Sequence, residues 1–199
     1  MSNPKRKRKN RHSSEEGVEE IPRLEKTEPL QLRYYGDPVL RKRAAPVPEI
    51  TYEEVKLAED MLNTLYYTEV GIGLAATQVG ILKRFLIVDI REEKEDETGL
   101  FMLFNPEILN SEGEDIAEEG CLSIPDLRAD VKRPEKIIVR AVDLRNQSVE
   151  FEADELLARV IQHEIDHLNG TLFIDRISGL KRQLLSDELK KIQKADRPT

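Results

Sequence analysis

Apolar residues recur every three or four positions in three stretches of the chain, which is the spacing expected of an amphipathic helix. The first predicted helix spans about 52–68, where Thr51 followed by Glu54 forms a capping-box signal at its start. The second spans 155–168, and the third spans about 178–194 with basic residues opposite its apolar positions. The pattern therefore predicts an N-terminal helix, an internal helix and a C-terminal amphipathic helix.

Strands are predicted between the first two helices, where apolar runs are bounded by turn-forming residues. The first two of these runs flank a charged turn and are expected to pair antiparallel. The predicted strands span 85–90, 100–104, about 127–133, 136–144 and 148–153. No strand is expected in the polar, acidic segment 107–117.

A segment rich in small residues, 71–80, is expected to form a tight loop between the first helix and the first strand. It has no Lys-Ser or Lys-Thr pair, so it does not fit a phosphate-binding loop. Gln78 is the one side chain in it whose amide can both donate and accept hydrogen bonds.

The net charge of −8 is unevenly distributed along the chain. The first twelve residues hold no acid and six bases, which are Lys5, Arg6, Lys7, Arg8, Lys9 and Arg11. The remainder has 25 basic and 39 acidic residues, a net charge of −14. Such an acidic body argues against DNA binding, whereas the basic arm is suited to touch RNA. We expect 1–29 to be a disordered extension and 30–199 to be a single folded domain.

The chain has one cysteine, so it cannot form an internal disulfide. It contains no apolar run as long as a membrane span and no apolar signal-peptide core. A reducing, cytoplasmic location without membrane association is therefore expected.

His163 and His167 stand four residues apart in the predicted helix 155–168, with Glu164 directly after the first. This H-E-x-x-H spacing places both imidazoles on one helical face, where they can reach a single metal ion, and it brings the glutamate to the same site. The alternative is a helix with two partly buried histidines that are bonded to backbone groups or carboxylates.

A hydrolytic metal site needs a third protein ligand and an open position for water. Two candidates follow from the sequence, the lone Cys121 and Glu188, which lies 21 residues after His167. Glu188 falls in a lysine-rich amphipathic helix, where an exposed glutamate is expected. The setting of Cys121, after a glycine and shortly before Pro125, favours the cysteine.

These motifs together resemble the peptide deformylase family. Three of its motifs occur in order, G-I-G-L-A-A-T-Q at 71–78, E-G-C-L-S at 119–123 and Q-H-E-I-D-H at 162–167. The G-D-P-V-L-R stretch at 36–41 also resembles the start of the family's domain, and the likeness covers about residues 30–180. It implies an α+β fold with antiparallel β-sheets packed around a central metal-binding H-E-x-x-H helix.

The resemblance implies a metal-dependent hydrolase that removes the N-formyl group from the formylmethionine of newly made polypeptides and releases formate. Cys121, His163 and His167 would hold one divalent metal ion, and Glu164 would act as general acid and base. Fe(II) is the ion that the resemblance favours, with Zn(II), Ni(II) and Co(II) also compatible with these ligands. A ferrous site with a thiolate ligand is expected to be oxygen-sensitive.

By the same resemblance, the Gln78 amide and the Leu122 backbone N–H would donate hydrogen bonds to the oxyanion. Backbone groups of Ile72 and Gly73 would pair with the extended substrate. Ile72, Leu122, Leu156 and Val160 are candidates to line the specificity pocket. Arg159 departs from the aliphatic residue of some family members, and we expect it to face solvent and to pair with a neighbouring carboxylate.

Formylmethionyl nascent peptides are the expected partners, with transient ribosome contact through the C-terminal helix and the basic N-terminal tail. Two other functions are kept as alternatives. One is a zinc metallopeptidase with Glu188 as the third ligand, and the other is a non-catalytic ribosome-binding homologue.

Overall fold

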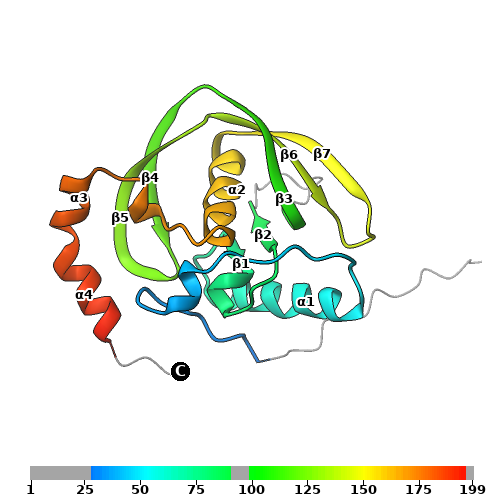
Figure 1. Cartoon of the computed structure of the whole chain (residues 1–199), viewed down its shortest axis with the longest axis horizontal. Coiled ribbons are helices and arrows are strands. Elements are labelled where there is room, and N and C mark those ends of the chain that lie inside the picture. The colour runs from blue at the N-terminus through cyan, green and yellow to red at the C-terminus, as the bar shows by residue number, and fades with distance from the viewer. Residues whose placement is uncertain (1–27, 91–98, 196–199) are drawn as a thin grey trace, which may run out of the picture.

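The computed structural model describes residues 28–90 and 99–195 (Figure 1). The helices are α1 (Tyr52–Tyr67), α2 (Glu155–Leu168), α3 (Gly179–Leu184) and α4 (Ser186–Lys194), with short 3-10 helices η1 (Pro38–Arg41), η2 (Ala76–Val79) and η3 (Phe173–Asp175). The strands are β1 (Gly73–Ala75), β2 (Phe85–Asp89), β3 (Leu100–Glu112), β4 (Asp115–Cys121), β5 (Ile124–Arg133), β6 (Lys136–Val142) and β7 (Ser148–Asp154). The predicted extension at 1–29 lies outside the described residues, except for its last two.

Two antiparallel sheets organise the described part of the chain. Five strands pair in the order β1-β2-β3-β6-β7, which leaves β1 at an edge, and β4 and β5 form a separate hairpin. Helix α2 packs against β1, β2, β6 and β7 and runs through the middle of the molecule, with the β4–β5 hairpin on the left of Figure 1. The predicted α+β class with antiparallel sheets is therefore confirmed.

Strand β2 explains how the two long helices share one sheet. Its side chains alternate between the two faces, as the pleat requires. Leu86 and Val88 join the apolar cluster that α2 covers, whereas Phe85 and Ile87 join the cluster beneath α1. All four side chains are fully buried, so β2 appears in the sequence as a continuous apolar run.

The segment 107–117 was expected to lack strands, and this prediction was wrong. The second half of β3 and the first half of β4 occupy it. Most of these residues are exposed, so no apolar alternation marks them as strand. Their extended conformation comes from pairing with the amphipathic partners β6 and β5.

The predicted C-terminal helix is divided into α3 and α4 at Leu185. The apolar residues of the two parts are offset by one position, which is about 100° around a continuous helix. Leu189 is buried in α4 and belongs to the same apolar cluster as Leu127 of β5, whereas Leu180 and Leu184 on α3 are exposed. The break therefore separates two apolar stripes that one straight helix could not bury on the same surface.

The small-residue segment 71–80 is more regular than the predicted loop. It contains strand β1 and the 3-10 helix η2, and it ends at Gly80 with a positive φ of 83°. None of the helices that the structure describes is long and apolar enough to cross a membrane.

The predicted capping box at the start of α1 is confirmed. Thr51 caps the helix, and the Glu54 carboxylate accepts a hydrogen bond from the Thr51 backbone N–H at 3.0 Å. Glu54 also accepts from Lys83, just before β2, and so ties the helix to the sheet. Hydrogen bonds from Lys83 and Thr51 lower the pKa of Glu54 from 4.5 to about 2.

Replacing Glu54 by Gln is expected to reduce the free energy of unfolding at pH 7 by about 1–2 kcal/mol, because a charged acceptor is lost. Since the folded-state pKa is depressed, this stabilisation is present above about pH 4.5 and is lost as the pH falls toward 2. Urea denaturation at a series of pH values measures the effect. The exposed neighbour Glu53, replaced by Gln, is the control, and a difference that does not shrink in acid would contradict the assignment.

Candidate metal centre

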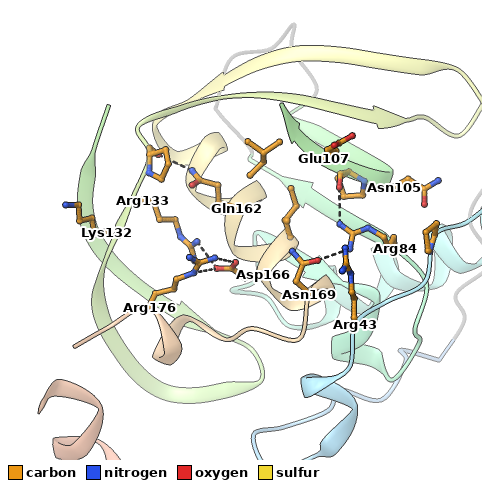
Figure 2. Close-up of a pocket in the computed structure, with 15 residues that line it drawn as sticks. Arg43, Arg84, Asn105, Glu107, Lys132, Arg133, Gln162, Asp166, Asn169 and Arg176 are labelled. Atoms are coloured by element: carbon orange, nitrogen blue, oxygen red, sulfur yellow. Dashed lines mark hydrogen bonds and ion pairs between the residues drawn. The ribbon is translucent and has the colours of Figure 1, made fainter. Parts of the chain in front are cut away.

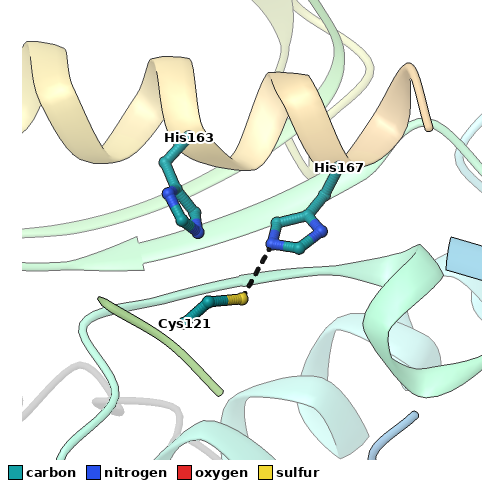
Figure 3. Close-up of side chains that lie close together, drawn as sticks. All are labelled: Cys121, His163 and His167. Atoms are coloured by element: carbon teal, nitrogen blue, oxygen red, sulfur yellow. Dashed lines mark hydrogen bonds between the residues drawn. The ribbon is translucent and has the colours of Figure 1, made fainter. Parts of the chain in front are cut away.

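Cys121, His163 and His167 bring their ligand atoms together, all within 4.8 Å of one another (Figure 3). The cysteine lies at the end of β4, and the two histidines lie one turn apart on α2. The Cys121 sulfur is 3.2 Å from Nε2 of His167. One thiolate and two imidazoles form a ligand set that binds divalent transition metals.

A carboxylate on β4 orients the first histidine. Oε2 of Glu119 lies 3.0 Å from Nδ1 of His163, so this ring nitrogen is engaged and Nε2 is left for the cluster. The Glu119 carboxylate also accepts two hydrogen bonds from Arg133, at 2.6 and 2.9 Å. Burial opposes ionisation of Glu119, but hydrogen bonds from His163 and Arg133 lower its pKa to about 2.

The two histidines of the cluster have pKa shifts in opposite directions. Burial by itself would lower the pKa of His163, yet Cys121 and Glu119 raise it well above its usual value. The pKa of His167 is lowered well below its usual value, first by burial and then by nearby positive charge. Its Nδ1 is buried without a hydrogen-bond partner among the described residues. The thiolate and the two imidazoles, with ligand atoms within 4.8 Å of one another, fit one divalent metal ion.

Glu164 lies beside this cluster, and its side chain is buried. Its Oε2 is buried and has no hydrogen-bond partner among the described residues. Burial raises the pKa of Glu164 to about 7, against the opposing effects of His163 and Arg133. A Cβ at Gly73 would lie 2.5 Å from Oε1 of Glu164, so the edge strand β1 can approach the carboxylate this closely only as glycine.

Both the oxygen and the nitrogen of the Gln78 side-chain amide have hydrogen-bond partners. Its Oε1 accepts a hydrogen bond from the Ala75 N–H at 2.8 Å, which turns Nε2 toward the cluster. Nε2 is 3.6 Å from the Cys121 sulfur and 3.4 Å from the Ser123 hydroxyl. The amide is therefore oriented as a donor at the site.

A cavity of about 580 Å³ opens beside the cluster. Cys121, His163 and Glu164 line it, together with the edge-strand residue Gly73 and Gln78. The four apolar residues expected in the pocket are also part of its wall, namely Ile72, Leu122, Leu156 and Val160. The sequence therefore identified most of the groups that meet here.

Two sequence expectations do not fit this geometry. Arg159 was expected to face solvent, but it is buried because the β4–β5 hairpin covers its side of α2. Its expected pairing with a carboxylate is confirmed, by Glu119 and Asp115. Glu188 is exposed on α4 and is not part of the ligand cluster, so the structure does not support a peptidase site with this residue as third ligand.

Glu119 and Arg133 were not assigned roles from the sequence, although a signal was present. Arg133 continues the alternation of buried residues in β5 that runs through Leu127, Ala129 and Val131. A charged residue in the inward-facing register requires a buried partner of opposite charge. This alternation could have indicated a buried ion pair near Cys121.

A second cavity, of about 640 Å³, lies on the opposite face of α2 (Figure 2). Three of the arginines that line this cavity already have ion-pair or hydrogen-bond partners within the protein. Arg133 and Arg176 both pair with Asp166, and Arg84 donates to the Pro106 carbonyl and to Asn169. None of the three metal-ligand residues lines this cavity, so it is not the candidate site. The ion pairs in its wall instead support the rear face of α2.

A family model described as polypeptide deformylase matches residues 29–183. A peptide deformylase from Thermodesulfovibrio yellowstonii is 47% identical over 161 residues, which cover 81% of this chain and 96% of that protein. One from Hydrogenovibrio crunogenus is 50% identical over 162 residues, covering 81% and 94% respectively.

Solved structures agree with these relatives. The crystal structure of a peptide deformylase from Legionella pneumophila has a TM-score of 0.76 and 39% identity, and the match covers 86% of this chain and 100% of that one. The enzyme from Synechococcus elongatus in complex with actinonin has a TM-score of 0.76 and 43% identity, covering 86% and 93%.

The cluster predicts that Cys121→Ala abolishes stoichiometric metal binding, because two imidazoles alone leave the site one ligand short. Glu188→Ala should retain full metal content. Elemental analysis of anaerobically loaded, desalted protein measures both, with circular dichroism to verify folding. Metal retained by Cys121→Ala and lost by Glu188→Ala would reverse the assignment.

Proposed function

The chain belongs to the polypeptide deformylase family, enzymes that remove the N-formyl group from nascent peptides, and we propose that it does so as a metal-dependent hydrolase. The substrate would be the N-terminal formylmethionine of a newly made polypeptide, and the products would be formate and a free amino terminus. The observation that carries this proposal is the convergence of Cys121, His163 and His167 next to the buried carboxylate of Glu164, whose Oε2 has no hydrogen-bond partner among the described residues.

Cys121, His163 and His167 would hold the ion, with Fe(II) favoured over Zn(II), Ni(II) and Co(II) by the family resemblance. When bound, a divalent ion supplies Lewis-acid catalysis, by polarising the formyl carbonyl and lowering the pKa of water. Glu119 would keep the His163 ring in the orientation needed for ligation.

Glu164 would be the general base and then the general acid. Its buried Oε2 accepts the proton of the attacking water while the water oxygen bonds to the formyl carbon. The same carboxyl then passes a proton to the amide nitrogen as the carbon–nitrogen bond breaks. Formate and the amine leave, and Glu164 returns to its ionised state.

Gln78 and Leu122 would stabilise the negative charge that develops on the formyl oxygen. The contact from Ala75 orients the Gln78 amide with Nε2 toward the site. Leu122 begins the two-residue turn between the paired residues Cys121 and Ile124, so its N–H lies outside the β4–β5 ladder. Two such preorganised donors suit an oxyanion.

The edge of β1 that lines the 580 Å³ cavity would bind the peptide backbone by strand addition. The Ile72 carbonyl already accepts a hydrogen bond from the Asp89 N–H at 2.9 Å, so this group faces β2. The substrate pairing that the sequence led us to expect of the Ile72 backbone does not fit this geometry. Backbone groups alternate in direction along a strand, which turns those of Gly73 toward the free edge. The 580 Å³ cavity next to them would accept the methionine side chain against Leu122, Leu156 and Val160.

The domain, its cellular location and its contact with the ribosome follow from the same function. Residues 30–199 would form the catalytic domain, and the enzyme would act in the cytoplasm. Ribosome contact would use the C-terminal helices, where Leu180 and Leu184 are exposed next to Lys181 and Arg182, together with the basic N-terminal tail.

Anaerobically Fe(II)-loaded protein should release formate rapidly from an N-formylmethionyl tripeptide. Glu164→Ala should reduce kcat about 10²–10⁴-fold, because it removes general acid–base catalysis, while metal content stays unchanged. A coupled formate assay measures the rate, and Glu188→Ala serves as the control. If the folded, metal-loaded protein releases no formate, the proposed function is refuted.

Gly73→Ala should reduce kcat/KM about 10²-fold, because the new Cβ displaces the Glu164 carboxylate, and misplacement by about 1 Å costs that much. Gly179→Ala is a matched control, since its Cβ would meet nothing within 4 Å. Unchanged kcat/KM in Gly73→Ala would show that the close approach to Glu164 has no catalytic role.

A further inference from the structure

The ligands of the metal centre come from two separate parts of the fold. His163 and His167 belong to α2, which packs on the five-stranded sheet, whereas Cys121 belongs to the β4–β5 hairpin, a sheet of its own. Within residues 28–90 and 99–195, the hairpin does not pair with any strand of the five-stranded sheet on which the helix packs. Apolar residues of the hairpin pack with Leu172, Phe173 and Ile174, which follow α2 in the chain. Side-chain bridges add direct contacts between the hairpin and α2 itself.

One bridge lies on the rear face of α2. Arg133 of β5 donates to Asp166 of α2 at 2.9 Å, and Arg176 supports the same carboxylate (Figure 2). Arg133 also holds Glu119, so this bridge joins both strands of the hairpin to the helix.

Arg159 makes a second bridge, in the wall of the 580 Å³ cavity. Its Nη1 donates to the Glu119 carboxylate at 2.7 Å and to the Val131 carbonyl at 3.0 Å. Its Nη2 donates to the side chain of Asp115 at 2.8 Å and to the Asp115 carbonyl at 3.1 Å. One guanidinium from α2 therefore binds the start of β4, the end of β4 and the second half of β5.

The position of this bridge ties it to the ligands. Arg159 precedes His163 by one helical turn on the same face of α2. It binds one oxygen of Glu119, and His163 binds the other, while Cys121 follows Glu119 by two residues in β4. A shift of Glu119 would therefore move both a histidine ring and the strand that carries the sulfur.

We propose that Arg159 is a positioning residue that clamps the hairpin to α2 through Glu119 and so sets the affinity of the site for its metal ion. The inference rests on the metal centre of the proposed function. A planar guanidinium suits this task because it donates along several fixed directions at once, which an ammonium cannot do.

The test is metal binding by Arg159→Met, a substitution that keeps much of the side chain's length but removes its donors. Glu119 would retain both hydrogen bonds from Arg133 and the contact with His163, and Asp115 is half exposed, so neither carboxylate is left buried alone. Arg140→Met is the matched control, because Arg140 forms an exposed pair with Glu150.

Co(II) is the probe, since its thiolate-to-metal charge-transfer band reports ligation by Cys121 directly. Arg159→Met should bind Co(II) about tenfold to a hundredfold more weakly than the unmodified chain, the range found for outer-shell partners of metal ligands. The charge-transfer band of the saturated variant should also be weaker. Arg140→Met should leave both quantities unchanged.

Arg159→Lys separates the clamp from charge alone. The lysine keeps the positive charge beside Glu119 but cannot reach all three partners, so its Co(II) affinity should fall between those of the other two proteins. If Arg159→Met fails to fold, Arg159→Lys decides the question, with thermal unfolding of the metal-free protein as the measure of integrity. Affinity equal to that of the unmodified chain in a folded Arg159 variant overturns the proposal.

This experiment uses no substrate, so it remains informative if formate release fails. A chain that binds Co(II) but does not deformylate would refute the proposed function and leave the role of Arg159 to be judged by affinity. A chain that binds no Co(II) would refute the metal centre and the clamp together.

Discussion

The buried carboxylate of Glu119 accepts hydrogen bonds from His163, Arg133 and Arg159 at the same time. A carboxylate removed from water is costly unless its charge is compensated, and here two guanidinium groups and an imidazole supply that compensation. Because these partners come from α2 and β5 while Glu119 lies on β4, neutralising one charge also joins three elements. The geometry of the candidate metal centre depends on this junction.

A second contact that shapes the site is made by close packing, between the edge strand β1 and helix α2. Strand β1 approaches α2 so closely that Gly73 leaves no space for a Cβ beside Glu164. The Glu164 carboxyl is buried at this contact, and burial raises its pKa to about 7. Glu119 is bonded to His163 and Glu164 follows it in the chain, yet their surroundings shift their pKa values in opposite directions. Such divergence is typical of sites where carboxyl groups have different tasks.

The two sheets have different roles at the candidate metal centre. The five-stranded sheet buries apolar side chains on both faces of β2 and gives α2 a rigid support, so the histidines are held by the largest part of the core. The β4–β5 hairpin contributes Cys121 and one wall of the cavity, and polar bridges hold it against α2. Charge-assisted hydrogen bonds of this kind are directional, whereas apolar packing is not. They therefore help to fix the distance between the hairpin and α2.

The sequence by itself determined the three helical stretches, the capping box at Thr51, most strands and the residues of the metal cluster, because each of these depends on local spacing or on residue chemistry. Tertiary structure decided what local spacing cannot encode. Strand β4 is extended because β5 pairs with it, and Arg159 is buried because partners distant in the sequence cover its face of α2. A charged residue on a helix has the same sequence pattern whether it meets water or a carboxylate, and only the folded chain supplies the partner.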